Sequence, residues 1–215
     1  MLFLGFGSGL PYILLISTST AWLRDVNVDL SYIGFFTWIT FTYTFKFAWA
    51  PLVDRFSVPF LAQYGHRKSW IAFMQILIFL SLLFISNIDP IENFILFCAV
   101  GATIAFAGSI QDIAIDAFRI EYAHISDQGN LAASYQLGYR LAIIAATSIA
   151  LIFADINGWS MTFKLMAGLM CLGLLGVIFS KEEKNKELGK LNFINSIVEP
   201  LKDFFSRFGM FMASI

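Results

Sequence analysis

Long apolar runs alternate with short polar segments along the whole chain. A membrane-spanning helix needs about 20 consecutive, mostly apolar residues. Six runs reach roughly that length, and they cover residues 2–23, 31–53, 69–86, 93–118, 135–154 and 159–179. A backbone in hydrocarbon must satisfy its own hydrogen bonds, so an open sheet cannot span a bilayer. The pattern therefore predicts an all-α membrane protein with six transmembrane helices.

The first run carries Gly5, Gly7, Gly9 and Pro11 among its apolar residues. Glycine and proline are tolerated in membrane helices, where small residues let neighbouring helices pack closely. A cleaved signal peptide is the alternative interpretation. No basic segment precedes the run, and it is longer than the apolar core of a signal peptide. We therefore expect residues 2–23 to be a true span.

Basic residues are distributed unequally between the two sets of loops. The loops after runs two, four and six contain Arg55, Arg67, Lys68, Arg119, Lys181, Lys184, Lys186 and Lys190. The loops on the other side contain only Arg24. Cytoplasmic loops are enriched in Lys and Arg, so both termini are predicted to be cytoplasmic. Tryptophans near the span ends suggest an interfacial aromatic belt, and they are Trp22, Trp49, Trp70 and Trp159.

The composition changes after the sixth run. Residues 181–190 form a charged stretch, and apolar side chains then recur every three or four residues from Ile194 to Phe208. This spacing predicts an amphipathic helix, which would lie on the membrane face or pack against cytoplasmic helix ends. We expect residues 1–180 to form the bundle, 181–209 a cytoplasmic linker with this helix, and 210–215 the start of a seventh span.

Composition excludes a soluble domain. Of 215 residues, 58% are hydrophobic and 13% are charged, with a mean hydropathy of +0.74. Soluble domains carry about 25% charged residues. Cys98 and Cys171 lie in apolar runs, which favours a packing role. The two histidines, His66 and His124, lack metal-ligating neighbours in the sequence.

No pattern of an enzyme is recognisable. The glycines at positions 5, 7 and 9 do not follow a strand, and no phosphate-binding loop is present in the sequence. We expect no cofactor, no metal and no nucleic acid among the partners of this chain.

Three charged residues fall inside the predicted spans. Lys46, Asp112 and Arg140 lie at similar predicted depth in runs two, four and five. Charges within a membrane are costly and usually face a bundle interior or water. Tyr43 shares a helical face with Lys46, and Gln136 shares one with Arg140.

Two bases and one acid in this layer would suit an anionic substrate. We hypothesise that Lys46 and Arg140 hold substrate anions, with Tyr43 and Gln136 beside them. Asp112 would balance one base or carry a proton. Two alternatives stay open. Asp112 pairs with a base only to join helices, or Lys46 extends to the cytoplasmic interface.

A second charged group lies at the cytoplasmic ends of the helices. Asp54, Arg55, Arg67 and Lys68 are in the loop after run two. Asp116 and Arg119 lie about one turn below Asp112. We interpret these six residues as a cytoplasmic latch. Lys164 is expected to extend outward from the bundle.

The order of these elements resembles the N-terminal half of a major facilitator transporter. Such proteins have two six-helix halves around a midplane site. Their signature loop between helices 2 and 3 is similar to Asp54-Arg55 followed by Gly65-His66-Arg67-Lys68. This chain departs from that pattern, because residues 56–64 are inserted and Ala50 stands at the usual glycine.

Further motifs resemble the AmpG muropeptide permeases. They occur in order as residues 5–11, 33–36, 45–55, 111–117 and 137–140. The resemblance covers residues 2–180. It implies proton-coupled import of anhydro-muropeptides across the bacterial inner membrane during peptidoglycan recycling. A related branch carries acetyl-coenzyme A, so transport of another anion is an alternative.

The length of the chain leaves its activity open. Alternating access requires two halves that move against each other. We expect the chain to act with a second half-transporter or as a homodimer, and an inactive truncated fragment is the competing hypothesis. The partners expected besides these are an anionic small molecule, protons and the lipid bilayer. The sequence does not establish whether Met1 is the native start.

Overall fold

The computed structural model describes residues 1–56, 58, 61, 65–122 and 125–180, and its regular elements are all helical. The first helical segment consists of α1 (Leu2–Ile13), η1 (Leu14–Thr18) and α2 (Ser19–Asp25). The second consists of α3 (Leu30–Thr37), η2 (Trp38–Thr40), α4 (Phe41–Thr44) and α5 (Lys46–Arg55). The others are α6 (His66–Ile85), α7 (Phe94–Tyr122), η4 (Ile125–Asp127), α8 (Gln128–Ile144), η5 (Ala145–Ile149), α9 (Ala150–Asn157) and α10 (Trp159–Phe179). The predicted all-α class is confirmed.

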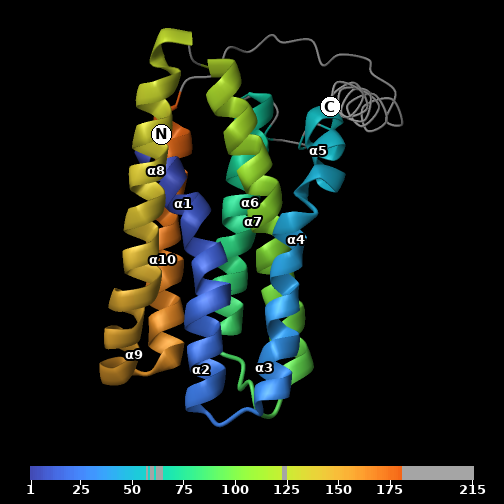
Figure 1. The fold of residues 1–215 in the computed structure, drawn as a ribbon, viewed down its shortest axis with the longest axis vertical. Helices are drawn as coiled ribbons and strands as arrows, with labels where there is room; N and C mark the ends of the chain where they lie inside the picture. Colours follow the sequence, from blue (N-terminus) through green and yellow to red (C-terminus); the bar gives the residue numbers. More distant parts are fainter. Residues whose placement is uncertain (57, 59–60, 62–64, 123–124, 181–215) are drawn as a thin grey trace, which may run out of the picture.

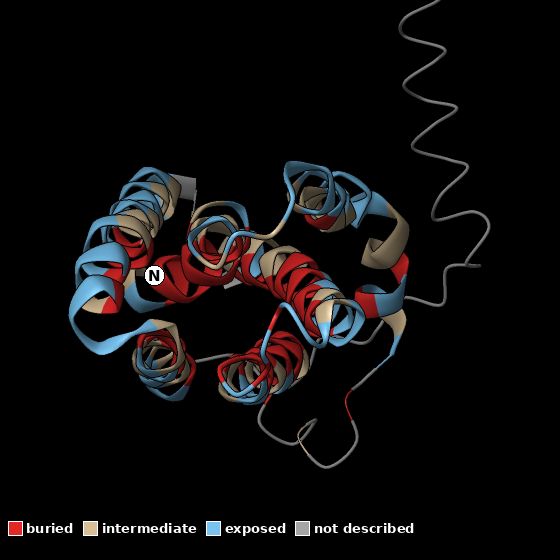
Figure 2. Cartoon of the chain, turned by 90° about the horizontal axis from the view of Figure 1, so that it is seen from below, coloured by how far each residue is buried: buried red, intermediate tan, exposed pale blue. Residues whose placement is uncertain are grey.

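The helices form two layers. The front layer in Figure 1 contains α8–α9, α1–α2, α7 and α3–α5, and the layer behind it contains α10 and α6. Helix α1 packs between α8, α7 and α10, and α6 packs between α7 and α10. Figure 2 shows buried residues concentrated where α1, α6, α7 and α10 face one another. The core therefore depends on α1 and α7, which lie at its centre.

Consecutive segments alternate in direction. The connections α2–α3, α6–α7 and α9–α10 lie at one end of the bundle, which is the lower end in Figure 1. The ends of α5 and α7 lie at the other end, together with the starts of α6 and α8. This up-and-down order is the alternation that consecutive spans require. The predicted linker and seventh span, residues 181–215, fall outside the described residues.

Five described helices are long and apolar enough to cross a membrane, which makes the chain a multi-pass membrane protein. The second predicted span is present but is not continuous. A 3₁₀ turn at Trp38–Thr40 and a turn at Phe45 divide it. The hydroxyls of Thr37, Thr40 and Thr42 donate to carbonyls three residues earlier. Such bonds compete with regular helix geometry. Lys46 therefore begins a new helix instead of continuing one.

Glycines set the spacing between α1 and α8. A Cβ on Gly138 would overlap the carbonyl oxygen of Leu2, and a Cβ on Gly5 would overlap that of Tyr135. The two backbones consequently touch along this contact. Small residues allow such an approach between membrane helices. Helix α7 shows the same device, because Cβ atoms on Gly101 and Gly108 would meet Phe36 and Tyr43.

A π turn follows α1 and another follows α8, and the two turns face each other. Residues Leu14–Thr18 and Ala145–Ile149 are π-helical and lie in contact. The Thr18 hydroxyl donates to the carbonyl of Ala146, joining the turns. Wider helical turns release carbonyls from the regular ladder, and π turns are common at functional sites.

The predicted tryptophan belt is wrong for two of its members. Trp22 and Trp70 are buried, with 6% and 8% of their surface exposed. Trp22 stacks on Trp159 with 6.1 Å between ring centroids, and the Trp159 indole donates to Asp25 at 2.7 Å. The Trp70 indole donates to the carbonyl of Phe56 at 2.6 Å. These rings join helix ends inside the protein.

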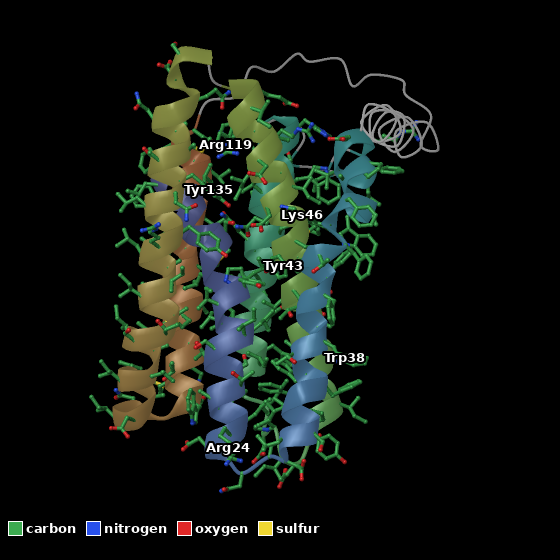
Figure 3. The ribbon with its side chains drawn as sticks, viewed as in Figure 1. Arg24, Trp38, Tyr43, Lys46, Arg119 and Tyr135 are labelled. Atoms are coloured by element: carbon green, nitrogen blue, oxygen red, sulfur yellow. The ribbon has the colours of Figure 1, made fainter. Side chains whose placement is uncertain are left out.

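Exposed aromatic rings lie instead along α3–α5. They follow a spacing of three or four residues, and they are Tyr32, Phe35, Trp38, Phe41 and Phe45. Figure 3 shows Trp38 pointing away from the bundle. An outward apolar stripe is what contact with lipid or another apolar surface requires.

A single methyl group tests the contact between α1 and α8. Gly138→Ala should lower the free energy of unfolding by about 1–3 kcal/mol, because the added atom overlaps backbone that cannot move away cheaply. The measurement is thermal unfolding of the purified chain in detergent, followed by tryptophan fluorescence.

The control for that substitution is Gly168→Ala on α10, where a Cβ meets no atom within 4 Å. Alanine favours a helix by up to about 1 kcal/mol relative to glycine, so this variant should be neutral or more stable. Equal melting temperatures for the two variants would contradict the packing account.

Candidate functional site

A hydrogen-bond chain connects three helices near the middle of the bundle. The Ser8 hydroxyl on α1 donates to Oδ1 of Asp112 on α7. The same Ser8 oxygen lies 2.7 Å from the hydroxyl of Tyr135 on α8. Ser8 is 1% exposed, so water does not compete for this hydroxyl from outside the protein. Asp112 is thus held by a neutral donor, and it makes no ion pair with any described residue.

A second chain of charges lies beside the first. Lys46 at the start of α5 is 3.8 Å from Oδ2 of Asp116. Arg119 is 3.4 Å from Oδ1 of the same carboxylate. The Arg119 guanidinium also lies over the Tyr135 ring, 5.6 Å from its centroid. Figure 3 shows Lys46, Arg119 and Tyr135 around the same region between α8 and α5.

The second chain is more open than the first. The side chains of Lys46 and Asp116 are 47% and 39% exposed. An exposed ion pair contributes little to stability and exchanges partners easily. This pair can therefore open to accept another anion on Lys46. Such an opening would leave the buried Ser8 contact in place.

Tyr43 forms one wall of the site. Its hydroxyl lies against Gly108 of α7 and has no hydrogen-bond partner among the described residues. Its ring meets that of Tyr12 edge to face, with 4.8 Å between centroids. Tyr43 thus joins α4 to α1 and α7, and it supplies a phenol that has a free hydrogen-bonding capacity.

The charges of this cluster balance while Asp112 is ionised. Lys46 and Arg119 are positive, and Asp112 and Asp116 are negative. Protonation of Asp112 would leave one net positive charge beside an exposed base. The arrangement can therefore couple proton uptake to anion binding by simple electrostatics.

The structure brings only some of the predicted site residues together. Lys46, Asp112 and Tyr43 lie in the cluster, but Arg140 and Gln136 do not. Both are exposed on α8, and Gly138 occupies the face that meets α1. A residue two positions from Gly138 is rotated by about 200° around the helix axis. Asp112 is therefore not joined to Arg140, and Lys46 pairs with Asp116 instead of Asp112.

The predicted cytoplasmic latch divides in the same way. Arg67 donates to Asp54 at 2.7 Å and to Glu121 at 2.9 Å, joining α6 to α5 and α7. Lys68 donates to the carbonyl of Ser180 at 2.8 Å. Arg55 lies at the end of α5. Asp116 pairs with Lys46 and Arg119, so Asp116 and Arg119 belong to the cluster around Lys46.

Three residues of these networks were not predicted from the sequence. They are Ser8, Glu121 and Tyr135. Ser8 is a lone hydroxyl among glycines, which is a detectable signal for a polar contact on a close-packed face. Tyr135 begins the fifth apolar run, four residues before Tyr139. The sequence therefore shows two tyrosines on one helical face, but it does not show that Tyr135 contacts Ser8. Glu121 lies two residues beyond Arg119 near the end of the same helix, and its spacing from Arg67 in the sequence gives no signal of their contact.

A cavity lies at the opposite end of the bundle. It has a volume of about 850 Å³ between the α2–α3 and α6–α7 connections. Its lining contains Asp29 and Glu92 and no basic residue. The amide of Ser31 donates to Asp29 at 2.8 Å, and this bond lowers the pKa of the Asp29 carboxyl. The acids here do not suit an anionic ligand, so this cavity is a poor candidate for the substrate site.

Comparison with known proteins assigns the whole chain to one family, the one that its sequence motifs resemble. A family model described as Major Facilitator Superfamily matches residues 1–215. The chain is 35% identical over 208 residues to the anhydromuropeptide permease of Escherichia coli K12, which covers 96% of this chain and 42% of the permease.

Two other relatives show a similar coverage. A Rickettsia conorii protein with the provisional name transporter AmpG 4 is 33% identical over 211 residues, which cover 95% of this chain and 51% of that protein. An uncharacterized Haemophilus influenzae protein is 32% identical over 213 residues, which cover 98% of this chain and 49% of that protein. The chain thus spans about half the length of these relatives.

The Arg67 network makes a prediction about coupling energies. A double-mutant cycle with Arg67→Gln and Glu121→Gln should give about 1–2 kcal/mol. The corresponding cycle with Asp54→Asn should give less, because Asp54 is more exposed and makes one contact. The measurement is unfolding of the purified chain in mixed detergent micelles.

A cycle between Arg67→Gln and Glu92→Gln is the matched control, since Glu92 lies at the other end of the bundle. It should give no coupling. A coupling for Glu121 as small as that for Glu92 would show that the Arg67 network does not hold α6 to α7.

Proposed function

The chain belongs to the major facilitator superfamily, and on that premise we propose that it forms the N-terminal half of a proton-coupled importer of anhydro-muropeptides. The similarity to the anhydromuropeptide permease supports the substrate class. A second half, supplied by the same or another polypeptide or by a second copy, would complete the central site.

The observation that carries the proposal is the proximity of an exposed base, Lys46, to a half-buried acid, Asp112. Lys46 and Asp112 lie in one cluster, and the ion pair of Lys46 with Asp116 is long and open. An anionic substrate such as a muropeptide carboxylate can replace Asp116 on Lys46. Asp112 has no ion-pair partner among the residues that the structure describes, so it is the group that we propose gains and loses a proton.

Import would follow from the order in which Asp112 gains a proton and then loses it. Protonation of Asp112 leaves the cluster with a net positive charge, which strengthens binding of an anion. Release of the proton to the cytoplasm restores balance and weakens that binding. The proton gradient of the inner membrane would then drive accumulation of the substrate. The proposed orientation places the α5–α6 and α7–α8 ends in the cytoplasm, as their basic residues favour.

Arg140 and Gln136 keep their predicted role as a separate proposal. Their face of α8 is exposed in this chain and could meet substrate only from a second half. Asp54, Arg67 and Glu121 would act as the cytoplasmic latch, because the Arg67 bonds join α5, α6 and α7 near that end.

Replacement of the exposed base tests the substrate site. Lys46→Met should reduce uptake of radiolabelled anhydro-muropeptide at least about tenfold at subsaturating concentration, since a hydrogen bond to a charged group contributes about 1.5–3 kcal/mol. The assay uses permease-null bacterial cells that express the chain with its second half. Arg140→Met in the same assay tests the α8 proposal.

Lys164→Met is the matched control, because Lys164 is an exposed lysine of α10 outside the cluster. Its uptake should equal that of the unmodified protein. Full uptake by Lys46→Met would rule out the role of Lys46. An unmodified protein that takes up no muropeptide but transports another anion would contradict the substrate class.

The orientation has its own test with cysteine labelling. After removal of Cys98 and Cys171, Asn87→Cys and Asp127→Cys introduce thiols at exposed positions at opposite ends. A membrane-impermeant maleimide should label Asn87→Cys in intact spheroplasts. Asp127→Cys should react only after permeabilisation. The reverse pattern would invert the proposed topology.

A further inference from the structure

We infer that Ser8 and Tyr135 form a reversible hydrogen-bond relay, which converts protonation of Asp112 into release of the Tyr135 hydroxyl as a donor for an anion. The inference rests on the proposed function for its use in transport. Its structural basis is independent, because it depends on the hydrogen bonds between α7, α1 and α8 alone.

The direction of the chain follows from counting protons. A serine hydroxyl has one proton to donate, and Ser8 donates it to Oδ1 of Asp112. The Tyr135 oxygen lies 2.7 Å from the Ser8 oxygen, so Tyr135 must be the donor in that bond. With Asp112 ionised, both hydroxyl protons therefore point toward the carboxylate. Tyr135 then has no proton left to offer a ligand.

Protonation of Asp112 reverses this order. The new O–H of the carboxyl can donate to Ser8, which then turns its own proton toward Tyr135. The phenol now accepts from Ser8, and its proton is free to point elsewhere. Each hydroxyl keeps one proton throughout, and only Asp112 gains one. No bond within the chain has to be lost, because every donor and acceptor exchanges roles with its neighbour.

The freed phenol proton lies where an anion would bind. The Tyr135 ring contacts the Arg119 guanidinium, which is joined through Asp116 to Lys46. Ser8 is almost fully buried, whereas Asp112 and Tyr135 are both half-buried. The relay thus has a buried hydroxyl at its centre, and its phenol end belongs to the ring that Arg119 contacts. Ser8 and Tyr135 act as positioning residues, and Tyr135 also becomes a donor in the protonated state.

Close packing keeps the relay in register. A Cβ on Gly5 would overlap the carbonyl oxygen of Tyr135, so the Tyr135 backbone rests directly on α1 one turn before Ser8. The titratable groups that face the Asp112 carboxyl are Lys46 from α5, Tyr43 from α4, Asp116 from α7, and Tyr135 and Tyr139 from α8. Tyr12 of α1 lies against Tyr43. Only Tyr135 of these is joined to Asp112 through a hydroxyl.

Infrared difference spectroscopy of the purified chain in nanodiscs tests the relay without any substrate. The carboxyl band that disappears in Asp112→Asn reports protonation of Asp112, and the tyrosine C–O band reports whether a phenol donates or accepts. At high pH one tyrosine C–O band should have the frequency of a phenol that donates a hydrogen bond, and acidification should shift it to that of a phenol that accepts one. Tyr135→Phe should abolish that shift. Ser8→Ala should abolish it while Tyr135 is still present.

The same titration gives a quantitative result. Loss of the Ser8 donor removes a bond to the ionised carboxylate, so Ser8→Ala should protonate at a proton concentration about tenfold lower, a change of about one pH unit. Tyr135→Phe should shift the midpoint in the same direction by less. Tyr139→Phe is the matched control, because that hydroxyl makes no hydrogen bond with a described residue. It should change neither the midpoint nor the tyrosine band.

Melting curves separate these effects from misfolding, since all three variants should unfold within a few degrees of the unmodified chain. A pH-dependent tyrosine shift that persists in Ser8→Ala, or a Tyr135→Phe titration identical to that of Tyr139→Phe, would overturn the relay. Because no substrate is involved, a working relay in a protein that does not carry muropeptides would contradict only the proposed function.

Discussion

The hydrogen bonding of one carboxyl group, that of Asp112, determines much of this structure. A carboxylate inside a membrane bundle must find donors within the protein, because lipid offers none. Asp112 finds its donor on α1, and that donor is supported by α8. Both helices must therefore approach α7 closely and in a fixed register. Gly5 and Gly138 allow the backbones of α1 and α8 to come close together. The contact of the Tyr135 carbonyl with Gly5 fixes the position of α8 along α1.

This requirement connects packing to function. The same backbone contact that brings α8 onto α1 places Tyr135 between the Asp112 carboxyl, which it reaches through Ser8, and the charges of Arg119, Asp116 and Lys46. The Ser8 hydroxyl that holds Asp112 is almost fully buried, whereas the Lys46–Asp116 pair is accessible. A site with these two ends can respond to a proton and to an anion separately. It needs no large movement within this half of the protein, so rigid-body motion against a second half is compatible with it.

The sequence predicted the all-α class and the order of the helical segments because lipid selects long apolar runs by length and composition. The second predicted run is broken, and it is not among the five described helices long enough to cross a membrane. It also identified Lys46 and Asp112, since charges in such runs are rare. It could not predict which way each helix is rotated about its axis. Arg140 shows the consequence, because the Gly138 contact turns it away from the cluster. The break in the second span was equally hidden, since it depends on threonine hydroxyls that bond to the backbone.

Ser8, Tyr135 and Glu121 were missed for a related reason. Each matters through a partner on a helix far away in sequence, and hydropathy carries no information about such pairs. The glycines beside Ser8 were the one local sign of a close helix contact. Of the predicted latch, Arg67 joins Asp54 to Glu121, whereas Asp116 and Arg119 lie with Lys46 in the partly exposed cluster.

The central claim is that Asp112 carries the proton while Lys46 holds the anion, and transport in proteoliposomes tests it most directly. The complete transporter is reconstituted with Asp112→Asn, which keeps the shape of the side chain and removes its titration. The account predicts that exchange of labelled for unlabelled muropeptide continues, while accumulation driven by a pH gradient is lost. Accumulation by Asp112→Asn equal to that of the unmodified transporter would contradict it.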